Sequence, residues 1–336
     1  MSDISELVHV SDNYIVTYEI SGGSIFLFNR KGQIVSHFNR KGQSSQDYPR
    51  ISGGVVFDEK NEEIFVCGQT AVQVYTINGG HKRTLKIIPM ENITLYNFDN
   101  ETLLVYEDIV TDLNEEKSFN KKPYRLVSKK DGSDVAILDI YLPQRYSTRT
   151  VQLISKKTSG TTTTATVRSH IIRYDSNSHY GQDFVIADRS SDTMYLLTQD
   201  KKLTPILTRK PSVHASEPRK VWTTLFTSDK YLFFEIITLD FNKSEGGRNP
   251  VFIYEFKTGE VYETSISNTE HVKRDWSPHW SPHGSAATTK NMTADLMDVS
   301  RLKDADRNNR LKGEFKKLVA TLDEDDNPII MIVKFK

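Results

Sequence analysis

The chain has 336 residues, and its 44 Lys and Arg are balanced by 44 Asp and Glu, so it carries no formal net charge at neutral pH. No segment gathers basic residues among aromatic ones, which argues against a nucleic-acid-binding protein. The single cysteine, Cys67, excludes an internal disulfide and is expected in a buried strand, because free cysteine packs as a small apolar residue.

The ends of the chain bear on where the protein resides. Met1–Glu6 has neither a basic segment nor a long apolar core, so no export signal is visible, although a chain whose leader had been trimmed would look the same. The longest apolar runs, such as Ile329–Val333, have strand length and fall far short of the roughly 20 residues that span a bilayer. We expect a soluble protein without a transmembrane segment.

The first part of the chain sets the pattern for the rest. Three β-rich runs, Tyr14–Tyr18, Ser24–Phe28 and Ile34–Phe38, are separated by polar turns that contain glycine. Glycine supplies the positive φ angle that tight turns require. Such a meander of antiparallel strands is the unit from which propeller blades are built.

The same plan recurs four more times, at about 50 residues per unit, which is within the range for propeller blades. Asp108–Pro123 is a polar insertion in the third unit and is expected to form a long loop. The threonine-rich Ser159–Val167 favours extended structure, either as an outer hairpin or as an exposed loop beside a strand. The expected strands of units two to five are Gly54–Phe57, Glu63–Val66, Ala71–Ile77 and Arg83–Ile88; Ile93–Phe98, Thr102–Tyr106, Tyr124–Val127 and Val135–Leu138; His170–Tyr174, Asp183–Asp188, Thr193–Leu197 and Leu203–Leu207; and Val221–Phe226, Tyr231–Ile237, Val251–Phe256 and Val261–Thr264.

The sixth unit breaks the pattern. Apolar residues recur there every three to four positions, which is helical spacing. A polar stretch, Asp304–Asn309, divides them into two short helices, and Pro328–Phe335 is the expected final strand. The apolar residues are Leu296, Val299, Leu302, Leu311, Phe315, Leu318 and Leu322.

The fold predicted from these units is all-β: a six-bladed β-propeller, as a single domain over residues 1–336, with a helical insertion at about 292–322 before the last strand. An open ring would leave two sheet edges with unpaired backbone groups. The N- and C-terminal segments are therefore expected in one blade or in adjacent blades.

Three segments resemble the NHL-like six-bladed β-propeller proteins of gut bacteria: Phe28–Gly32, Asn39–Gln43 followed by Asp47-Tyr48-Pro49, and Asp325–Lys334. The resemblance covers essentially the whole chain. Members of that family look like exported or lipid-anchored envelope proteins, mostly without an assigned activity, so the resemblance implies a periplasmic or cell-envelope location. Where the family has a glycine-rich run before Glu-Tyr, this chain has Ser44-Ser45-Gln46, which argues against a backbone anion site at that turn.

The most unusual composition is the near-tandem Trp-Ser-Pro-His repeat at 275–283. At the mouth of a central channel, Trp276 and Trp280 could stack on a sugar ring or another flat ligand. His279 and His283 could act as hydrogen-bond partners or metal ligands, but the prolines oppose the helix that a His-x3-His metal pair favours. Alternatively, the prolines stiffen a loop between blades, the indoles fill core and the histidines are solvated. The candidate ligand-binding residues are Asp275, Trp276, His279, Trp280, His283 and, near a predicted strand end, Arg173.

Other charged residues are weaker candidates. Propeller loops commonly build binding surfaces near strand ends, but the residues there are better explained as ordinary strand-end or inter-blade charges: Tyr174, Asp188, Arg189 and Arg219. Asp323–Asn327 resembles a calcium loop only in composition, because it lacks the glycine and the terminal glutamate of such loops, and a solvated turn is expected there.

The chain carries no serine-hydrolase elbow, phosphate loop, dinucleotide fingerprint or zinc-protease helix. The function expected is therefore non-enzymatic binding, without cofactor, catalytic residue or bound metal, of a glycan, peptide or protein partner around the channel. One alternative is a metal-assisted lyase or hydrolase with its site in the channel, because propeller active sites assemble from distant loops. Another is a purely structural assembly module.

Overall fold

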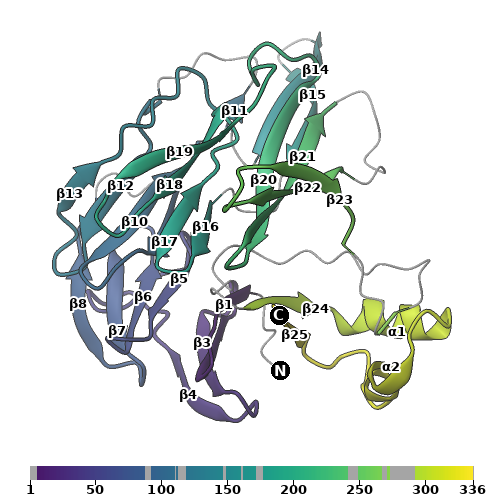
Figure 1. Cartoon of the computed structure of the whole chain (residues 1–336). Coiled ribbons are helices and arrows are strands. Elements are labelled where there is room, and N and C mark those ends of the chain that lie inside the picture. Colours follow the sequence, from purple (N-terminus) through teal and green to yellow (C-terminus); the bar gives the residue numbers. More distant parts are fainter. Residues whose placement is uncertain are drawn as a thin grey trace.

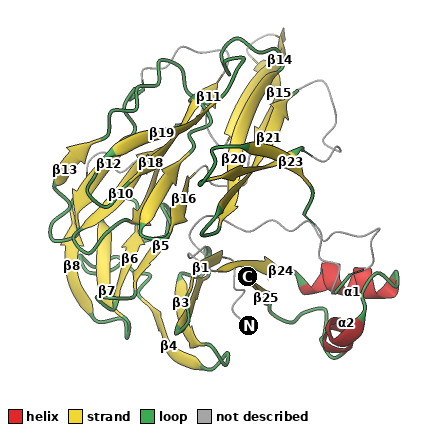
Figure 2. Ribbon diagram, in the orientation of Figure 1, coloured by secondary structure: helices red, strands yellow, loops and turns green. Residues whose placement is uncertain are grey.

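The computed structural model describes residues 6–87, 92–109, 111–112, 119–146, 149–159, 162–171, 177–240, 249–266, 271–272 and 292–335. Over these residues the chain is almost entirely β-structure, with two short helices close to its C-terminal end (Figures 1 and 2). The predicted all-β class and the helical insertion before the last strand are confirmed.

In the described part of the chain, five antiparallel sheets have four strands each, and strands adjacent in a sheet follow one another along the chain apart from the short β11. Their strands are β1 (Glu6–Val10), β2 (Tyr14–Tyr18), β3 (Ser24–Asn29) and β4 (Ile34–Asn39); β5 (Val55–Asp58), β6 (Glu63–Cys67), β7 (Val72–Thr76) and β8 (His81–Leu85); β9 (Ile93–Asn97), β10 (Thr102–Glu107), β12 (Tyr124–Ser128) and β13 (Asp134–Ile137); β16 (Asn177–Tyr180), β17 (Asp183–Ile186), β18 (Thr193–Leu197) and β19 (Leu203–Thr208); and β20 (Arg219–Thr227), β21 (Tyr231–Leu239), β22 (Val251–Glu255) and β23 (Val261–Thr264).

Two smaller sheets complete the described β-structure. One has three strands, in which β14 (Arg149–Ser159) and β15 (Thr162–Ile171) form a long hairpin and β11 (Thr111–Asp112) pairs parallel with β14. The other pairs β24 (Met292–Met297) with β25 (Ile329–Lys334). The helices α1 (Val299–Arg307) and α2 (Gly313–Ala320) lie between β24 and β25 in the sequence and beside them in space (Figure 1).

The sheets are arranged as propeller blades, with the first strand of each on the inside. Inter-sheet contacts join β24 to β1, β1 to β5, β5 to β9 and β16 to β20. A hydrogen bond from Asn177 Nδ2 to the Tyr96 hydroxyl, 3.2 Å long, joins β16 to β9. The β24–β25 sheet and the five four-stranded sheets thus lie side by side in succession.

The hydrophobic core lies between neighbouring sheets rather than at one centre. One cluster joins the first and second sheets and includes Val16, Leu27 and Ile64, while others lie between each later pair of four-stranded sheets. Leu7 and Val10 of β1 pack against Ala294 of β24. Because every sheet buries apolar side chains on both faces, most of these strands read as apolar runs rather than as strict alternation.

The helical insertion is held by its own small core. Asp298 caps α1, because its Oδ1 accepts a hydrogen bond from the backbone N–H of Arg301 at 3.0 Å, a pattern that stabilises helix N-termini. Leu302 of α1 and Val319 of α2 are buried against Met297 at the end of β24. The two helices therefore extend the sixth, two-stranded sheet outward.

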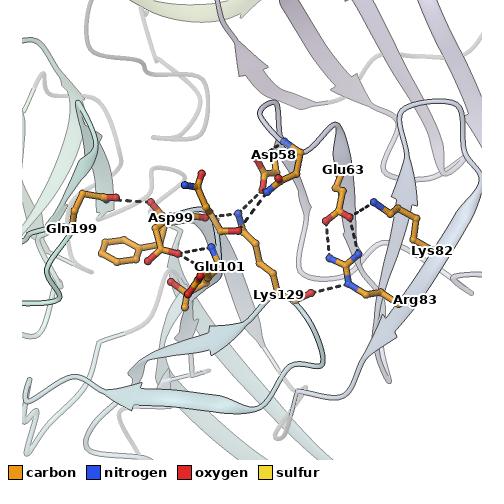
Figure 3. A network of polar contacts seen from close by, with 12 residues as sticks. Asp58, Glu63, Lys82, Arg83, Asp99, Glu101, Lys129 and Gln199 are labelled. Atoms are coloured by element: carbon orange, nitrogen blue, oxygen red, sulfur yellow. Dashed lines mark hydrogen bonds and ion pairs between the residues drawn. The ribbon is translucent and has the colours of Figure 1, made fainter.

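A buried polar network ties the second and third sheets together at one end (Figure 3). Lys129 Nζ lies 2.6 Å from Asp58 Oδ2 and also donates to the Asp99 carbonyl oxygen. The Lys129 carbonyl oxygen accepts from Arg83 Nε at 2.8 Å, and Arg83 forms a two-pronged ion pair with Glu63 at 2.7 and 2.6 Å. We call these five residues the Lys129 network.

Three sequence-based expectations need correction. The first sheet has a fourth strand, β1, which lies before the three predicted ones. The first strand of the fourth four-stranded sheet is β16 and not His170–Tyr174, because His170 and Ile171 belong to the β14–β15 hairpin. Leu296 lies in β24 and not in a helix, because the 292–297 segment pairs with β25; the helices run from 299 to 320.

The N- and C-terminal segments were expected in one blade or in adjacent blades, and the second of these arrangements is confirmed. β1 and the β24–β25 pair lie in adjacent sheets and share a core cluster. The β14–β15 hairpin confirms the hairpin interpretation of the threonine-rich segment.

Candidate functional site

The residues that the sequence singled out most strongly lie outside the described part of the chain. Asp275, Trp276, His279, Trp280 and His283 fall within residues 273–291, and Arg173 and Tyr174 fall within 172–176. The site that the described residues form consists of other side chains.

A pocket of about 200 Å³ lies where the first strands of four sheets converge, and we call it the channel pocket. Its lining comes from β1, β5, β9 and β16, which are the first strands of four sheets, and from the turn after β16. The lining residues are Val8 and His9; Val55, Val56 and Phe57; Leu95, Tyr96 and Asn97; and His179 and Gly181.

His9 is oriented by two contacts. Its Nε2 lies 2.9 Å from Glu59 Oε2, and its ring packs edge-on against Phe57 with centroids 5.2 Å apart. Asn13 Nδ2 donates to the other carboxylate oxygen of Glu59 at 2.7 Å. The hydrogen bond from His9 is the main reason that the pKa of Glu59 falls to about 2, so Glu59 is ionised at neutral pH.

His179 is the second histidine of the pocket, on the opposite wall. Its ring meets Phe184 edge-on at 4.9 Å, and its backbone carbonyl accepts from the Thr227 hydroxyl of β20. Burial lowers the pKa of His179 to about 4, because removing an imidazolium from water is unfavourable. At neutral pH its imidazole is therefore uncharged, with one nitrogen able to donate and the other able to accept.

A chain of hydrogen bonds leads from the pocket into the protein. The Tyr96 hydroxyl accepts from Asn177, and the Tyr124 hydroxyl lies 3.3 Å from Asn177 Oδ1 and 2.9 Å from Asp188 Oδ2. Burial holds the pKa of Tyr124 well above its usual value, so Tyr124 stays a donor.

Asp188 is a structural anchor at the junction of three sheets. Its Oδ1 accepts from the Ser190 N–H at 2.7 Å, and its carbonyl oxygen accepts from the Trp222 indole at 2.8 Å. Asp188 and its neighbour Arg189 are almost completely buried, with exposures of 1 % and 2 % respectively. These contacts favour the interpretation of Asp188 and Arg189 as packing residues between blades.

Arg219 takes part in a separate cluster. Its Nε donates to the Tyr146 hydroxyl at 2.8 Å, and that hydroxyl lies 3.2 Å from His214 Nδ1. His214 Nε2 lies 3.0 Å from the Ser190 carbonyl, which can only accept, so Nε2 carries a proton and donates it to this bond. This cluster joins the connection before β14, the β17–β18 connection and the connection before β20.

The acidic segment near the C-terminal end is the last of the sequence-based candidates. Asp323–Asn327 is an exposed turn in which the Asp323 N–H donates to Asp326 Oδ2 at 2.8 Å, as expected for a solvated turn. Within the described ranges, no group of three or more His, Cys, Asp or Glu side chains could hold a metal ion. In the same ranges no helix has the length and hydropathy needed to cross a membrane.

Sequence reasoning missed the channel pocket because its polar residues are scattered singly over three strands. The pocket could have been predicted from a histidine or asparagine within the first strand of a unit, because that strand lines the channel of a propeller. His9 belongs to β1, which was not predicted. His179 belongs to β16, which the sequence analysis placed several residues too early in the chain.

Comparison with known proteins identifies the fold and family. A search of the curated proteins finds no match. Among solved structures, a Bacteroides fragilis protein described as a "putative exported protein" matches with a TM-score of 0.64 and 12 % identity, over 100 % of this chain and 92 % of its own.

Two further structures match less well. They are a DUF4221 member from Bacteroides vulgatus (TM-score 0.49, 12 % identity, 79 % of this chain and 81 % of its own) and virginiamycin B lyase from Staphylococcus aureus (0.43, 10 %, 88 % and 77 %). At such identities a likeness bears on the fold alone. The family model described as "Domain of unknown function (DUF4934)" matches residues 1–334, and the chain therefore belongs to the DUF4934 family.

Proposed function

We propose that this protein is a non-enzymatic binding protein of the cell envelope, and that the channel pocket is where it holds its ligand. The observation that carries the proposal is the pocket itself: a small, mostly apolar concavity with a few convergent polar side chains, His9, Asn97 and His179. This composition is typical of ligand sites rather than of packed core.

The position of the pocket supports a binding role. Its walls are mainly the innermost strands of four separate sheets, so the polar groups are held by a rigid framework of strands. A rigid site loses little conformational entropy when it binds. The ionised Glu59 is engaged by His9 and Asn13, which leaves it poorly placed to act as a general base.

The cell-envelope location is proposed on two grounds. The sequence resembles NHL-like propellers of the envelope, and the Bacteroides fragilis protein with the same fold carries a description as exported. Detecting the protein in cytosolic fractions alone, after expression of its full gene, would contradict this part of the proposal.

The Trp-Ser-Pro-His segment belongs to the proposal as a second contact region. We propose that Trp276 and Trp280 stack on a glycan or peptide, with Asp275, His279, His283 and Arg173 as polar contacts. The double variant Trp276→Ala/Trp280→Ala should lose binding of any glycan or peptide ligand; unchanged binding with intact folding would reject this region.

The test is a screen of the purified protein against glycan and peptide arrays, run in parallel with His179→Phe and with His37→Phe. His37 is an exposed histidine of β4 and serves as the matched control. We expect at least one ligand whose binding is lost in His179→Phe and retained in His37→Phe. Turnover of a sugar lactone, glycoside or peptide, or a stoichiometric metal that survives dialysis and supports activity, would overturn the proposal in favour of a lyase or hydrolase.

A further inference from the structure

The walls of the channel pocket restrict the ligand by charge. Its lining contains no Asp, Glu, Lys or Arg. His179 is neutral at physiological pH because of its lowered pKa, and His9 Nε2 is taken up by Glu59 at 2.9 Å. A charged group placed among these residues would lose its hydration and gain no counter-ion, which is strongly unfavourable.

The walls also restrict the ligand by shape. Three aliphatic residues with exposures of 5 to 7 %, Val55, Val56 and Leu95, line the pocket together with two aromatic residues, Phe57 and Tyr96. A cavity of about 200 Å³ is smaller than the roughly 300 Å³ at which drug-sized sites begin. The space therefore fits one ring rather than an extended chain.

The polar groups of the pocket are few and specific. Asn97 Oδ1 is buried and accepts no hydrogen bond from any described residue, and the His179 ring makes none within the described chain either. A buried acceptor without a donor is unfavourable until something supplies one. A pyranose would bring a hydroxyl on most of its carbons, which is more than these two side chains can satisfy.

From these constraints we infer that the channel pocket binds an uncharged aromatic ring that carries one hydrogen-bond donor, such as a phenol or an indole, with the donor directed to Asn97. This inference rests on the proposed binding function and specifies its ligand chemistry. The ring could belong to a free small molecule or to a Tyr or Trp side chain of a peptide, and both present the same group to the pocket.

The experiment compares matched probes on the wild-type protein by saturation-transfer NMR and titration. We expect phenol and indole to bind. Toluene, which lacks the donor, should bind about three- to tenfold more weakly, the usual range for one hydrogen bond. Benzoate, benzylamine and glucose should not bind. N-acetyl-tyrosinamide and N-acetyl-tryptophanamide separate the sources: binding as tight as that of phenol indicates a peptide side chain, and binding of phenol and indole alone indicates a small molecule.

The variant Asn97→Leu tests the role of the amide. It should bind toluene and phenol about equally, because the acceptor is gone while the apolar wall is kept. Asn78→Leu, in an exposed turn, is the matched control and should keep the preference for phenol. If Asn97→Leu does not fold, the wild-type probe series decides alone.

Two results would overturn the inference. If glucose or a charged probe binds in a manner that His179→Phe abolishes, the channel pocket is a binding site but its ligand class is wrong. If no aromatic probe binds while a ligand from the array screen does, the binding function stands and the aromatic inference fails. Preference for toluene over phenol would also exclude Asn97 as the acceptor.

Discussion

The same five-residue sequence occurs twice in this chain, and its local hydrogen bond is the same in both copies although the path of the chain differs. Asn29–Gln33 and Asn39–Gln43 both read Asn-Arg-Lys-Gly-Gln, and in both the asparagine Oδ1 accepts from the lysine N–H two residues later at 2.9 Å. The first copy closes the β3–β4 hairpin, with Gly32 at a φ of +76°. The second copy instead leaves the sheet, because the buried Tyr48 hydroxyl accepts from the Arg40 N–H and donates to the Gly23 carbonyl.

Cys67 illustrates a residue whose environment was predicted correctly. It lies in β6 with 1 % exposure, and burial raises the pKa of its thiol to about 12. Because the thiolate is the reactive form, we expect no reaction of the native protein with a disulfide reagent at pH 8, and one equivalent after unfolding in guanidinium. Rapid labelling of the native protein would contradict the burial of this strand.

His179 makes stability depend on pH. Its pKa is about 4 in the folded protein and near 6.5 when exposed, so the unfolded chain binds the proton more readily as pH falls below 6.5. Its contribution is fully present above pH 6.5 and is lost toward pH 4. Between pH 7.5 and 5 the loss is about 2 kcal/mol.

The measurement is the free energy of unfolding in denaturant at those two pH values. His179→Phe should remove this part of the pH dependence, and His37→Phe should keep it. Equal pH dependence in both variants would show that other groups cause it.

In the Lys129 network, a residue in the turn after one strand connects two neighbouring sheets. Lys129 lies just after β12, and its ammonium group reaches Asp58 at the end of β5 and the carbonyl of Asp99 after β9 (Figure 3). Side-chain exposures of 5 % for Lys129 and 3 % for Asp58 place this ion pair in the interior. A buried pair is strongly destabilising when only one partner is removed.

Lys129→Met should therefore lower the free energy of unfolding by about 3–5 kcal/mol, since it leaves a buried carboxylate without its cation. The matched control is Lys122→Met, which breaks the exposed pair with Asp139 and should leave stability nearly unchanged. The double variant Asp58→Leu/Lys129→Met should recover part of the loss. Similar chemical-denaturation midpoints for the two lysine variants would contradict this account.

The β14–β15 hairpin shows where element prediction failed. Arg149–Ser159 pairs with Thr162–Ile171, and this local pairing takes in His170 and Ile171. A periodic pattern alone cannot tell whether such a segment pairs with its neighbour in sequence or with the next blade. The blade therefore begins later, at β16.

At the scale of the whole molecule, closure of the ring depends on the ends of the chain. β24 packs against β1, and Phe335 after β25 stacks on Phe226 of β20 with centroids 5.4 Å apart. The β24–β25 sheet and the residue that follows it thus touch both the first and the fifth sheet. This is the arrangement that protects the inner strands on either side of the sixth position.

We propose that the chain unfolds as one unit, and that its last strand is required for this. A chain ending at Asn327 should lose the single cooperative transition in thermal unfolding followed by circular dichroism, and should self-associate in sedimentation through the exposed partner surface of β24. Phe335→Ala, which keeps β25, is the control and should retain one transition at a moderately lower temperature. A truncated chain that melts like the full one would show that the ring closes without β25.

The sequence by itself determined the all-β class, the blade-sized repeat, the two short helices, the burial of Cys67 and the solvated acidic turn at 323–327. All of these follow from periodicity, turn residues and propensities that act within a few residues. Only the tertiary structure decided that β1 completes the first sheet, that β14 and β15 leave the blades, and that His9, Asn97 and His179 line one pocket. These three residues come from strands up to about 170 positions apart in the sequence. The packing of sheets against one another brings them together, and a local sequence pattern cannot predict such a contact.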